Sequence, residues 1–386
     1  MDNLTHGLAG ALVAQAGFQQ RYGRAALVAL VVGAELPDID ALFDLAGPVA
    51  GFQHHRGITH SFIGGLGLAV LAATVLYAVL RYRPYWRMLG LLYLGVLLHI
   101  WMDYLTSYGT QILLPFDAGR YTADAVFIID FFYTGIIVAA LLLIRMVRRQ
   151  RQERYGRASL GWLLGGMGLW LSAPSLVQQP LLLLALKSLG GNLMMFAACV
   201  ALLARLGRQW QMACSTRLGY YGVGALAAYM ALCITNHALA ERRFATLLAP
   251  QTQRVQHIAA LPLPGGPFSW RGIAESASTY LVGHVSLLAP TLAMPHEVSK
   301  GPEDEGIVQA ISDYRLVRIF HDFARFPVIE YVPSEVEQMV RYSDLRFTGY
   351  GRERSWFDLV VYLDGAGQVR LIKFLNRAFL PHHPDF

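Results

Sequence analysis

Apolar runs long enough to cross a lipid bilayer constrain the fold of this chain more than any other feature. A spanning helix needs about 20 predominantly apolar residues. Runs of about this length cover residues 60–80, 88–106, 125–144, 158–176, 180–204 and 218–239. Only 15% of the chain is charged, whereas a soluble domain carries about 25% charged residues. The sequence therefore predicts a mainly α-helical protein built on a polytopic transmembrane helical bundle.

Arginine clusters separate these runs and predict how the bundle is oriented. They occupy residues 21–24, 81–87, 145–157 and 205–217, at every second junction between apolar runs. Because basic residues favour the cytoplasmic side, the other junctions are expected on the outer side. Arg242 and Arg243 go against this assignment. Orientation in a membrane also explains the net charge of +6 better than nucleic-acid binding does, because the basic residues flank the spans.

Two shorter apolar segments precede the first full span. Residues 4–20 end at Arg21, and residues 25–36 end at Pro37. Both are shorter than a spanning helix, so we expect them to be tilted, re-entrant or packed inside the bundle. The N-terminus has no basic region and no obvious cleavage site, so we expect no removable signal peptide.

The composition changes after residue 240, where apolar runs shorten and charge rises. Residues 262–267 are rich in Pro and Gly, and the branched and aromatic segments Tyr314–Phe320 and Trp356–Leu363 are typical of strands. Residues 364–367 predict a hairpin turn into a strand over Val369–Phe374. We therefore expect a small extramembrane α+β domain.

These patterns divide the chain into three expected parts. Residues 1–145 form a membrane-embedded domain, residues 146–245 add further transmembrane helices, and residues 246–386 form the extramembrane domain. The cysteines are too few and too scattered for a disulfide framework or a zinc site, and we expect them to be small packing residues; they are Cys199, Cys214 and Cys233.

A polar motif at the start of the first full span concentrates side chains that bind metals. Residues 54–61, His-His-Arg-Gly-Ile-Thr-His-Ser, hold three histidines. Further His and Asp residues lie at junctions on the same predicted side of the membrane: His6, Asp38, Asp40, His99 and Asp103. Ionisable residues in or beside spans are costly and usually functional. Each has a structural explanation when taken singly, but as a set they indicate one metal centre at the membrane edge.

The residue types and their spacing indicate which metal could bind. His99 and Asp103 are four residues apart on one expected helix and project from the same face. Imidazole and carboxylate together suit zinc, manganese or iron, and the lack of cysteine ligands disfavours a closed structural zinc site. We expect zinc first, and one or two ions.

Residues 1–145 resemble the YdjM-type family of membrane-bound, metal-dependent hydrolases, also described as LexA-regulated inner-membrane hydrolases. The resemblance rests on five pieces in the family's order: Asn3-Leu4-Thr5-His6, Pro37-Asp38-Ile39-Asp40, His55-Arg56-Gly57-Ile58-Thr59-His60-Ser61, His99 with Asp103, and Asp124 through Asp130. It implies a multi-pass protein of the bacterial inner membrane with hydrolase activity. A more distant similarity to zinc-dependent phospholipase C and P1-type nucleases implies phosphate-ester hydrolysis. The absence of a later His-x-x-x-Glu pair favours one or two ions over three.

The expected site residues fall into groups. The expected metal ligands are His6, Asp40, His60, His99 and Asp103. The expected catalytic residues are Asp38, His55, Arg56 and Arg120, with Asp38 and His55 at or just beyond the metal. Arg56 and Arg120 could hold a phosphate through forked hydrogen bonds, or equally contact a helix end or lipid headgroup. Asp124 and Asp130 could support the site, and Asp124 could instead cap the 125–144 helix.

The leading hypothesis is a membrane-bound, metal-dependent hydrolase acting on a phosphoester of a lipid or lipid-linked substrate, with the metal site and C-terminal domain on the outer side. One alternative is an ion or solute transporter, which would place charged residues deep inside several helices. Another is a non-enzymatic membrane scaffold with a structural metal. The remaining histidines of the C-terminal domain are expected to be structural or exposed: His284, His296, His321, His382 and His383.

Overall fold

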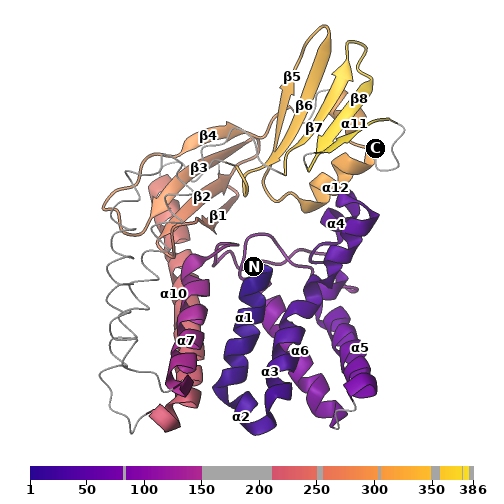
Figure 1. Cartoon of the computed structure of the whole chain (residues 1–386). Coiled ribbons are helices and arrows are strands. Elements are labelled where there is room, and N and C mark those ends of the chain that lie inside the picture. Colours follow the sequence, from indigo (N-terminus) through magenta and orange to yellow (C-terminus); the bar gives the residue numbers. More distant parts are fainter. Residues whose placement is uncertain are drawn as a thin grey trace.

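The computed structural model shows a helical region followed by two β-sheets (Figure 1). It describes residues 1–80, 84–149, 211–249, 255–302, 306–348, 357–375 and 377–381. The spans expected over 158–176 and 180–204 lie outside these described residues.

The helical region begins with several short helical segments and continues with longer helices. Its elements are α1 (Asn3–Val13), η1 (Ala14–Phe18), α2 (Gln19–Tyr22), α3 (Arg24–Glu35), η2 (Leu36–Ala46), α4 (Pro48–His54), η3 (Ile58–His60), α5 (Phe62–Leu80), α6 (Tyr85–Tyr104), α7 (Phe131–Arg149) and α10 (Gln211–Leu248). The segment expected over 4–20 breaks at Gly17, where a backbone φ of 98° ends the regular helix. Neither this segment nor α3, with 12 residues, has the length of a full span.

Among the described residues, two helices are long and apolar enough to cross a membrane: Tyr85–Tyr104, and Thr216–Leu248 within α10. A third candidate is the pair Pro48–His60 and Phe62–Ala78, which is bent by 81°. The shorter apolar helix Phe131–Val147 lies within α7. The predicted polytopic bundle is thus supported in part, as a mainly helical region with two or three candidate spans.

Close packing of α3 against α6 positions the ends of both helices. A side chain at Gly33 would lie 2.2 Å from the carbonyl oxygen of Leu92, and one at Gly95 would lie 2.7 Å from that of Leu30. Only glycine therefore fits at either position. The close approach brings the last turn of α3 beside His99, near the end of α6.

The second region contains two antiparallel sheets. The first sheet has the order β1 (His257–Pro262), β2 (Ser269–Glu275), β3 (Thr279–Ser286), β4 (His296–Ser299), and the second has β5 (Pro327–Val332), β6 (Glu337–Asp344), β7 (Leu359–Asp364), β8 (Val369–Phe374), β9 (Arg377–Phe379). Helices α11 (Gly306–Ile311) and α12 (Arg315–Phe323) lie between the two sheets in sequence. Together these elements cover the end of the helical region at which the N-terminus lies (Figure 1).

Two details of the sequence prediction for this region have opposite outcomes. The hairpin into Val369–Phe374 is confirmed, because β7 and β8 pair across a turn that begins at Asp364. The strand expected over Tyr314–Phe320 is wrong, because these residues begin α12. Leu316, Val317 and Phe320 are buried on one face of α12, and this spacing of three and four residues is that of an amphipathic helix.

The second region packs directly on α4 and on the loop after α6. Phe52 of α4 contacts Phe323 and Phe374, with ring centroids 4.6 and 5.0 Å apart. Arg346 donates hydrogen bonds to the carbonyl oxygens of Ser107 and Tyr108, at 3.2 and 2.8 Å. The second region therefore lies against α4 and the loop after α6, next to the polar residues at that end of the helices.

Candidate metal centre

Three side chains from two parts of the helical region converge at the end of α6. His99 and Asp103 lie four residues apart on α6, and His60 ends η3. The Nε2 atoms of His60 and His99 are 3.1 Å apart, and Asp103 Oδ2 is 3.4 Å from each of them. All three side chains are buried.

These separations resemble those between ligands of a single ion. Atoms that lie about 2.0–2.1 Å from a tetrahedral ion are about 3.3 Å from one another. The observed values of 3.1, 3.4 and 3.4 Å fit one face of such a tetrahedron. The three side chains could therefore bind a metal with little movement.

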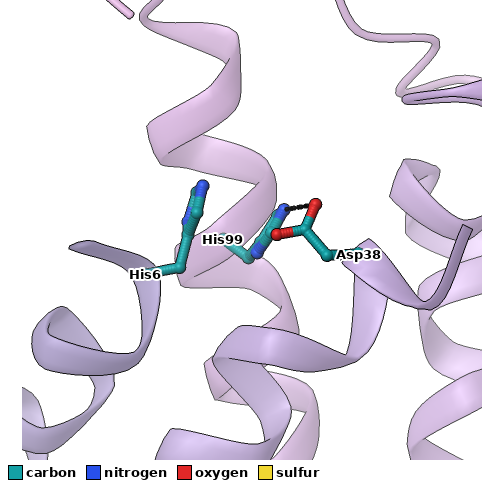
Figure 2. A group of neighbouring side chains, drawn as sticks. All are labelled: His6, Asp38 and His99. Carbon is teal, nitrogen blue, oxygen red and sulfur yellow. Dashed lines mark ion pairs between the residues drawn. The ribbon is translucent and has the colours of Figure 1, made fainter. Parts of the chain in front are cut away.

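Asp38 approaches the same pair of histidines from η2, and Figure 2 shows it beside His99. Its Oδ1 atom lies 3.5 Å from Nε2 of His60 and 3.6 Å from Nε2 of His99. Burial disfavours the charged form of Asp38, but the hydrogen bond with His60 and the charges of His99 and His6 outweigh it and lower the pKa of Asp38 to about 2. The carboxylate is therefore poised in its charged, ligand-competent form.

His6 of α1 adds a further imidazole to this cluster. Its ring stacks on that of His99 with centroids 3.6 Å apart (Figure 2), and its Nε2 atom is 3.3 Å from Asp103 Oδ1. The side chain is fully buried, and within the described part of the chain its Nδ1 atom has no hydrogen-bond partner. His6, Asp38 and His99 form a second group whose ligand atoms lie close enough together to bind an ion.

The Nδ1 atoms of the two central histidines are held by oxygen atoms. His99 Nδ1 lies 2.6 Å from the carbonyl oxygen of Ala34, which accepts a hydrogen bond and so fixes a proton on Nδ1. His60 Nδ1 lies 3.0 Å from Thr59 Oγ1 and 3.4 Å from Asp40 Oδ2. When His60 is neutral and also carries its proton on Nδ1, the Nε2 lone pairs of the two rings face each other at 3.1 Å. A cation between them would relieve the repulsion and use both lone pairs.

Asp40 contacts His60 at Nδ1, the ring nitrogen that does not face His99. Besides His60, it accepts a hydrogen bond of 2.9 Å from the backbone N–H of Arg56 and lies 3.2 Å from His55 Nδ1. It is therefore shared by two imidazole rings and one backbone amide. This geometry suits a carboxylate that orients histidines, whereas Asp38 has the position facing both Nε2 atoms.

Arg56 is buried against Asp103 and is turned away from the surface. Its Nη2 atom is 2.8 Å from Asp103 Oδ1, and its Nη1 donates a 2.8 Å hydrogen bond to Thr106. The guanidinium lies over the Tyr108 ring at 4.8 Å. Its backbone φ of 57° is uncommon for a residue with a side chain and marks a constrained turn. The amino group of Met1 also contacts Asp103 Oδ1.

The remaining predicted residues lie around the cluster. Arg120 donates hydrogen bonds to the carbonyl oxygens of His55, Gly109 and Gln53, at 3.3, 3.4 and 3.5 Å, and so ties the motif to the loop after α6. Asp124 forms an ion pair with Arg325 of the second region. Asp130 caps α7 by accepting hydrogen bonds from two backbone N–H groups, so the helix expected from residue 125 begins at Phe131 instead.

A pocket of about 340 Å³ lies beside the cluster. Its polar walls include Asp38, Asp40 and His55, and its aromatic walls are Phe52 and Tyr108. Leu375 of the second region completes the lining. The His55 side chain is 39% exposed, so a molecule in the pocket could reach its ring.

Sequence reasoning identified the clustered side chains but missed the groups that orient them. The carbonyl oxygen of Ala34 has no sequence signal, because every residue carries one. Thr59 and Thr106 are also part of the hydrogen-bond network, and Thr59 stands inside the conspicuous 54–61 motif. A polar residue beside a candidate ligand is therefore a signal that could have been used.

The comparisons with known proteins agree with the resemblance seen in the motifs. Residues 1–178 match the YdjM inner membrane protein family, which confirms the expected family for that part of the chain. An uncharacterized protein, YfhP of Bacillus subtilis (strain 168), is 30% identical over 100 residues. The match covers 26% of this chain and 31% of that relative, so it spans about a third of the relative's length. No solved structure matches the chain.

Proposed function

We propose that this protein is a metal-dependent hydrolase of the bacterial inner membrane, acting on a phosphoester of a lipid or lipid-linked substrate. The observation that carries the proposal is the pair of Nε2 atoms 3.1 Å apart, each ring anchored through Nδ1. Carboxylates flank this pair on Asp38 and Asp103. Buried charge of this kind is costly unless it binds a partner.

The proposed ligands are Asp38, His60, His99 and Asp103, with His6 completing the set or holding a second ion. Zinc suits these donors, as do manganese and iron. A bound ion would lower the pKa of a coordinated water so that hydroxide forms near neutral pH. Asp40 orients His60, and Arg56 holds Asp103, so we assign both of them positioning roles.

His55 is the proposed proton carrier. Its Nδ1 atom lies 3.2 Å from Asp40, which leaves Nε2 to face the pocket that the ring lines. An imidazole held by a carboxylate can accept a proton from water and donate it to a leaving oxygen. The His55 ring lies 6.0 Å from that of His60, so it could act on a substrate that sits in the pocket beside the proposed metal.

We also place the centre and the second region on the outer side of the membrane. The arginine clusters support this orientation through their positions in the sequence. In the structure the second region covers the end of the helices where the metal cluster lies.

The direct test is hydrolysis of phospholipids by the purified protein in detergent, with zinc, manganese or iron added in turn. We expect release of phosphate or of a phosphorylated headgroup, loss of activity with a chelator, and loss in His60→Ala. His284→Ala, an exposed histidine of β3, is the matched control and should keep full activity. Absence of hydrolysis by metal-loaded, folded protein across the main phospholipid classes would refute the proposed function.

A further inference from the structure

The connection between α3 and α4 is a 3₁₀-helix of unusual length. η2 runs for 11 residues, from Leu36 to Ala46, whereas 3₁₀ segments rarely exceed 3–4 residues. With about three residues per turn, side chains three positions apart share a face. The helix therefore has three distinct faces along its whole length.

One face of η2 forms part of the pocket. Asp38, Ala41 and Asp44 follow one another at intervals of three, and all of them line it, as does the buried Asp40 of an adjoining face. Asp38 also lies beside His60 of the candidate metal centre. This face of η2 therefore lines the pocket and carries two carboxylates.

The next face is apolar and uncovered. Ile39, Leu42 and Leu45, again at intervals of three, are 43%, 60% and 85% exposed. A water-soluble surface rarely presents large aliphatic side chains in an unbroken row. An amphipathic helix that lies in a membrane interface has this combination of one polar and one apolar face.

The position of η2 along the helices indicates what covers this face. η2 follows α3 directly, and the carbonyl oxygen of Ala34 contacts His99, close to the end of the candidate span Tyr85–Tyr104. With Tyr85–Tyr104 as a span, η2 would begin near the depth at which this helix leaves the hydrocarbon. It also packs against α5, which carries exposed Ile63 and Leu66 in its first turns.

We propose that η2 lies in the bilayer interface with Ile39, Leu42 and Leu45 in lipid, and that it is the edge over which substrate enters the pocket. The second part rests on the proposed hydrolase function. An amphiphile with a phosphate-bearing headgroup would place its phosphate against the cation proposed beside Asp38, while its acyl chains stay against Leu42 and Leu45. The substrate class that fits this arrangement is a membrane phospholipid taken directly from the bilayer.

Spin labels placed along η2 test the membrane contact without any activity measurement. Labels on single cysteines at positions 42 and 45 are compared with labels at 41 and 44, in protein whose natural cysteines are replaced by serine. In vesicles of phosphatidylethanolamine and phosphatidylglycerol, we expect positions 42 and 45 to be accessible to oxygen and shielded from a water-soluble nickel chelate. Positions 41 and 44 should show the reverse. Equal nickel accessibility at all four positions would overturn the proposal.

A second measurement covers the case in which the cysteine-free protein does not fold. Leu42→Trp and Asp44→Trp are prepared in the otherwise natural chain, in vesicles whose acyl chains carry bromine. The fluorescence added by Trp at position 42 should be quenched several-fold more than that added at position 44. Equal quenching would overturn the membrane contact.

Substrate entry is tested by comparing two phosphoesters of the same headgroup, one in vesicles and one with short, water-soluble chains. The double variant Leu42→Ser, Leu45→Ser should lose several-fold more kcat/KM on the vesicle substrate than on the soluble one. Equal losses on both would overturn the entry role. If the unmodified protein hydrolyses neither, the hydrolase function fails, while the label and quenching results decide the membrane contact separately.

Discussion

The buried polar groups of the two regions are satisfied in different ways. In the sheet region, Arg346 pairs with Asp344 at 2.8 Å and donates to the carbonyl oxygens of Tyr108 and Phe323, at 2.8 and 2.6 Å. Asp344 accepts further hydrogen bonds from the backbone N–H groups of Arg325 and Arg346. This network supplies donors and acceptors in balance and leaves nothing for an external partner to complete.

The helical region instead gathers acceptors around one point. His60 and His99 each use Nδ1 for an anchor and direct Nε2 to the centre, where carboxylate oxygens of Asp38 and Asp103 also lie. Arg56 and the Met1 amino group both contact Oδ1 of Asp103, which leaves Oδ2 facing the two histidines. The first network is satisfied by its own protein groups, whereas the second presents the donor atoms that the proposed cation would use.

The largest effect on stability is expected when the Arg346–Asp344 network of the sheet region is broken. Arg346→Ala leaves Asp344 buried without its charged partner, and removing one member of a buried pair costs about 3–5 kcal/mol. Thermal unfolding in detergent measures the loss. Arg341→Ala is the control, because its partner Glu330 is exposed and such pairs contribute at most about 1 kcal/mol. Equal losses of stability in the two variants would show that the buried Arg346–Asp344 pair does not stabilise the sheet region more than an exposed pair does.

Added metal should stabilise the protein through the His and Asp cluster of the helical region, and the Arg346–Asp344 network should play no part in this. Zinc at 100 times its dissociation constant stabilises a folded protein that binds it by about 2.7 kcal/mol. We expect the unfolding temperature to rise accordingly when zinc is added to metal-free protein. His60→Ala should abolish this response, whereas Arg341→Ala should retain it. A response of the same size in His60→Ala would move the site elsewhere.

A smaller effect is expected for the carboxylate that orients the ligands. Asp40→Asn keeps the shape of the side chain but weakens its hold on His60, and loss of such a partner lowers metal affinity about 10–100-fold. Competition with a zinc-binding dye measures this change. Asp44 lies on the same 3₁₀-helix and is exposed. The zinc affinity of the control variant Asp44→Asn should therefore match that of the unmodified protein. An unchanged affinity in Asp40→Asn would show that Asp40 does not support the metal.

The smallest effect is expected at the ion pair between the two regions. Arg325 is half-buried and pairs with Asp124, and partly exposed pairs contribute about 0.2–1 kcal/mol. Arg325→Gln should therefore lower stability only slightly and leave metal affinity unchanged, as measured by unfolding and dye competition. A large loss of metal affinity would mean that the second region positions the metal ligands.

Much of the cluster could be predicted from the sequence because its residues are rare in apolar surroundings. His6, His60, His99 and Asp103 are conspicuous between long hydrophobic runs, and the four-residue spacing of His99 and Asp103 specifies a shared helix face. Spacing alone did not separate the roles that we propose for Asp38 and Asp40. Those roles depend on η2, whose 3₁₀ geometry points the two carboxylates toward different atoms of the same histidine.

The sheet region shows where local patterns are ambiguous. The hairpin after Asp364 was predictable because its glycines and flanking strand residues agree with one another. Residues 314–320 are rich in branched and aromatic side chains, so local preference favoured a strand. Burial of Leu316, Val317 and Phe320 against the sheet made the segment a helix instead. Tertiary packing of this kind overrides a modest local preference.

Elemental analysis of the purified, folded protein shows whether the His and Asp cluster binds a metal. The unmodified protein is compared with a His60→Ala, Asp103→Ala double variant and with the His284→Ala control, each after incubation with zinc, manganese or iron and removal of free ions. We expect stoichiometric metal in the unmodified protein and in His284→Ala, and none in a double variant that remains folded. Metal-free protein in all three samples, or equal metal in all three, would contradict this expectation.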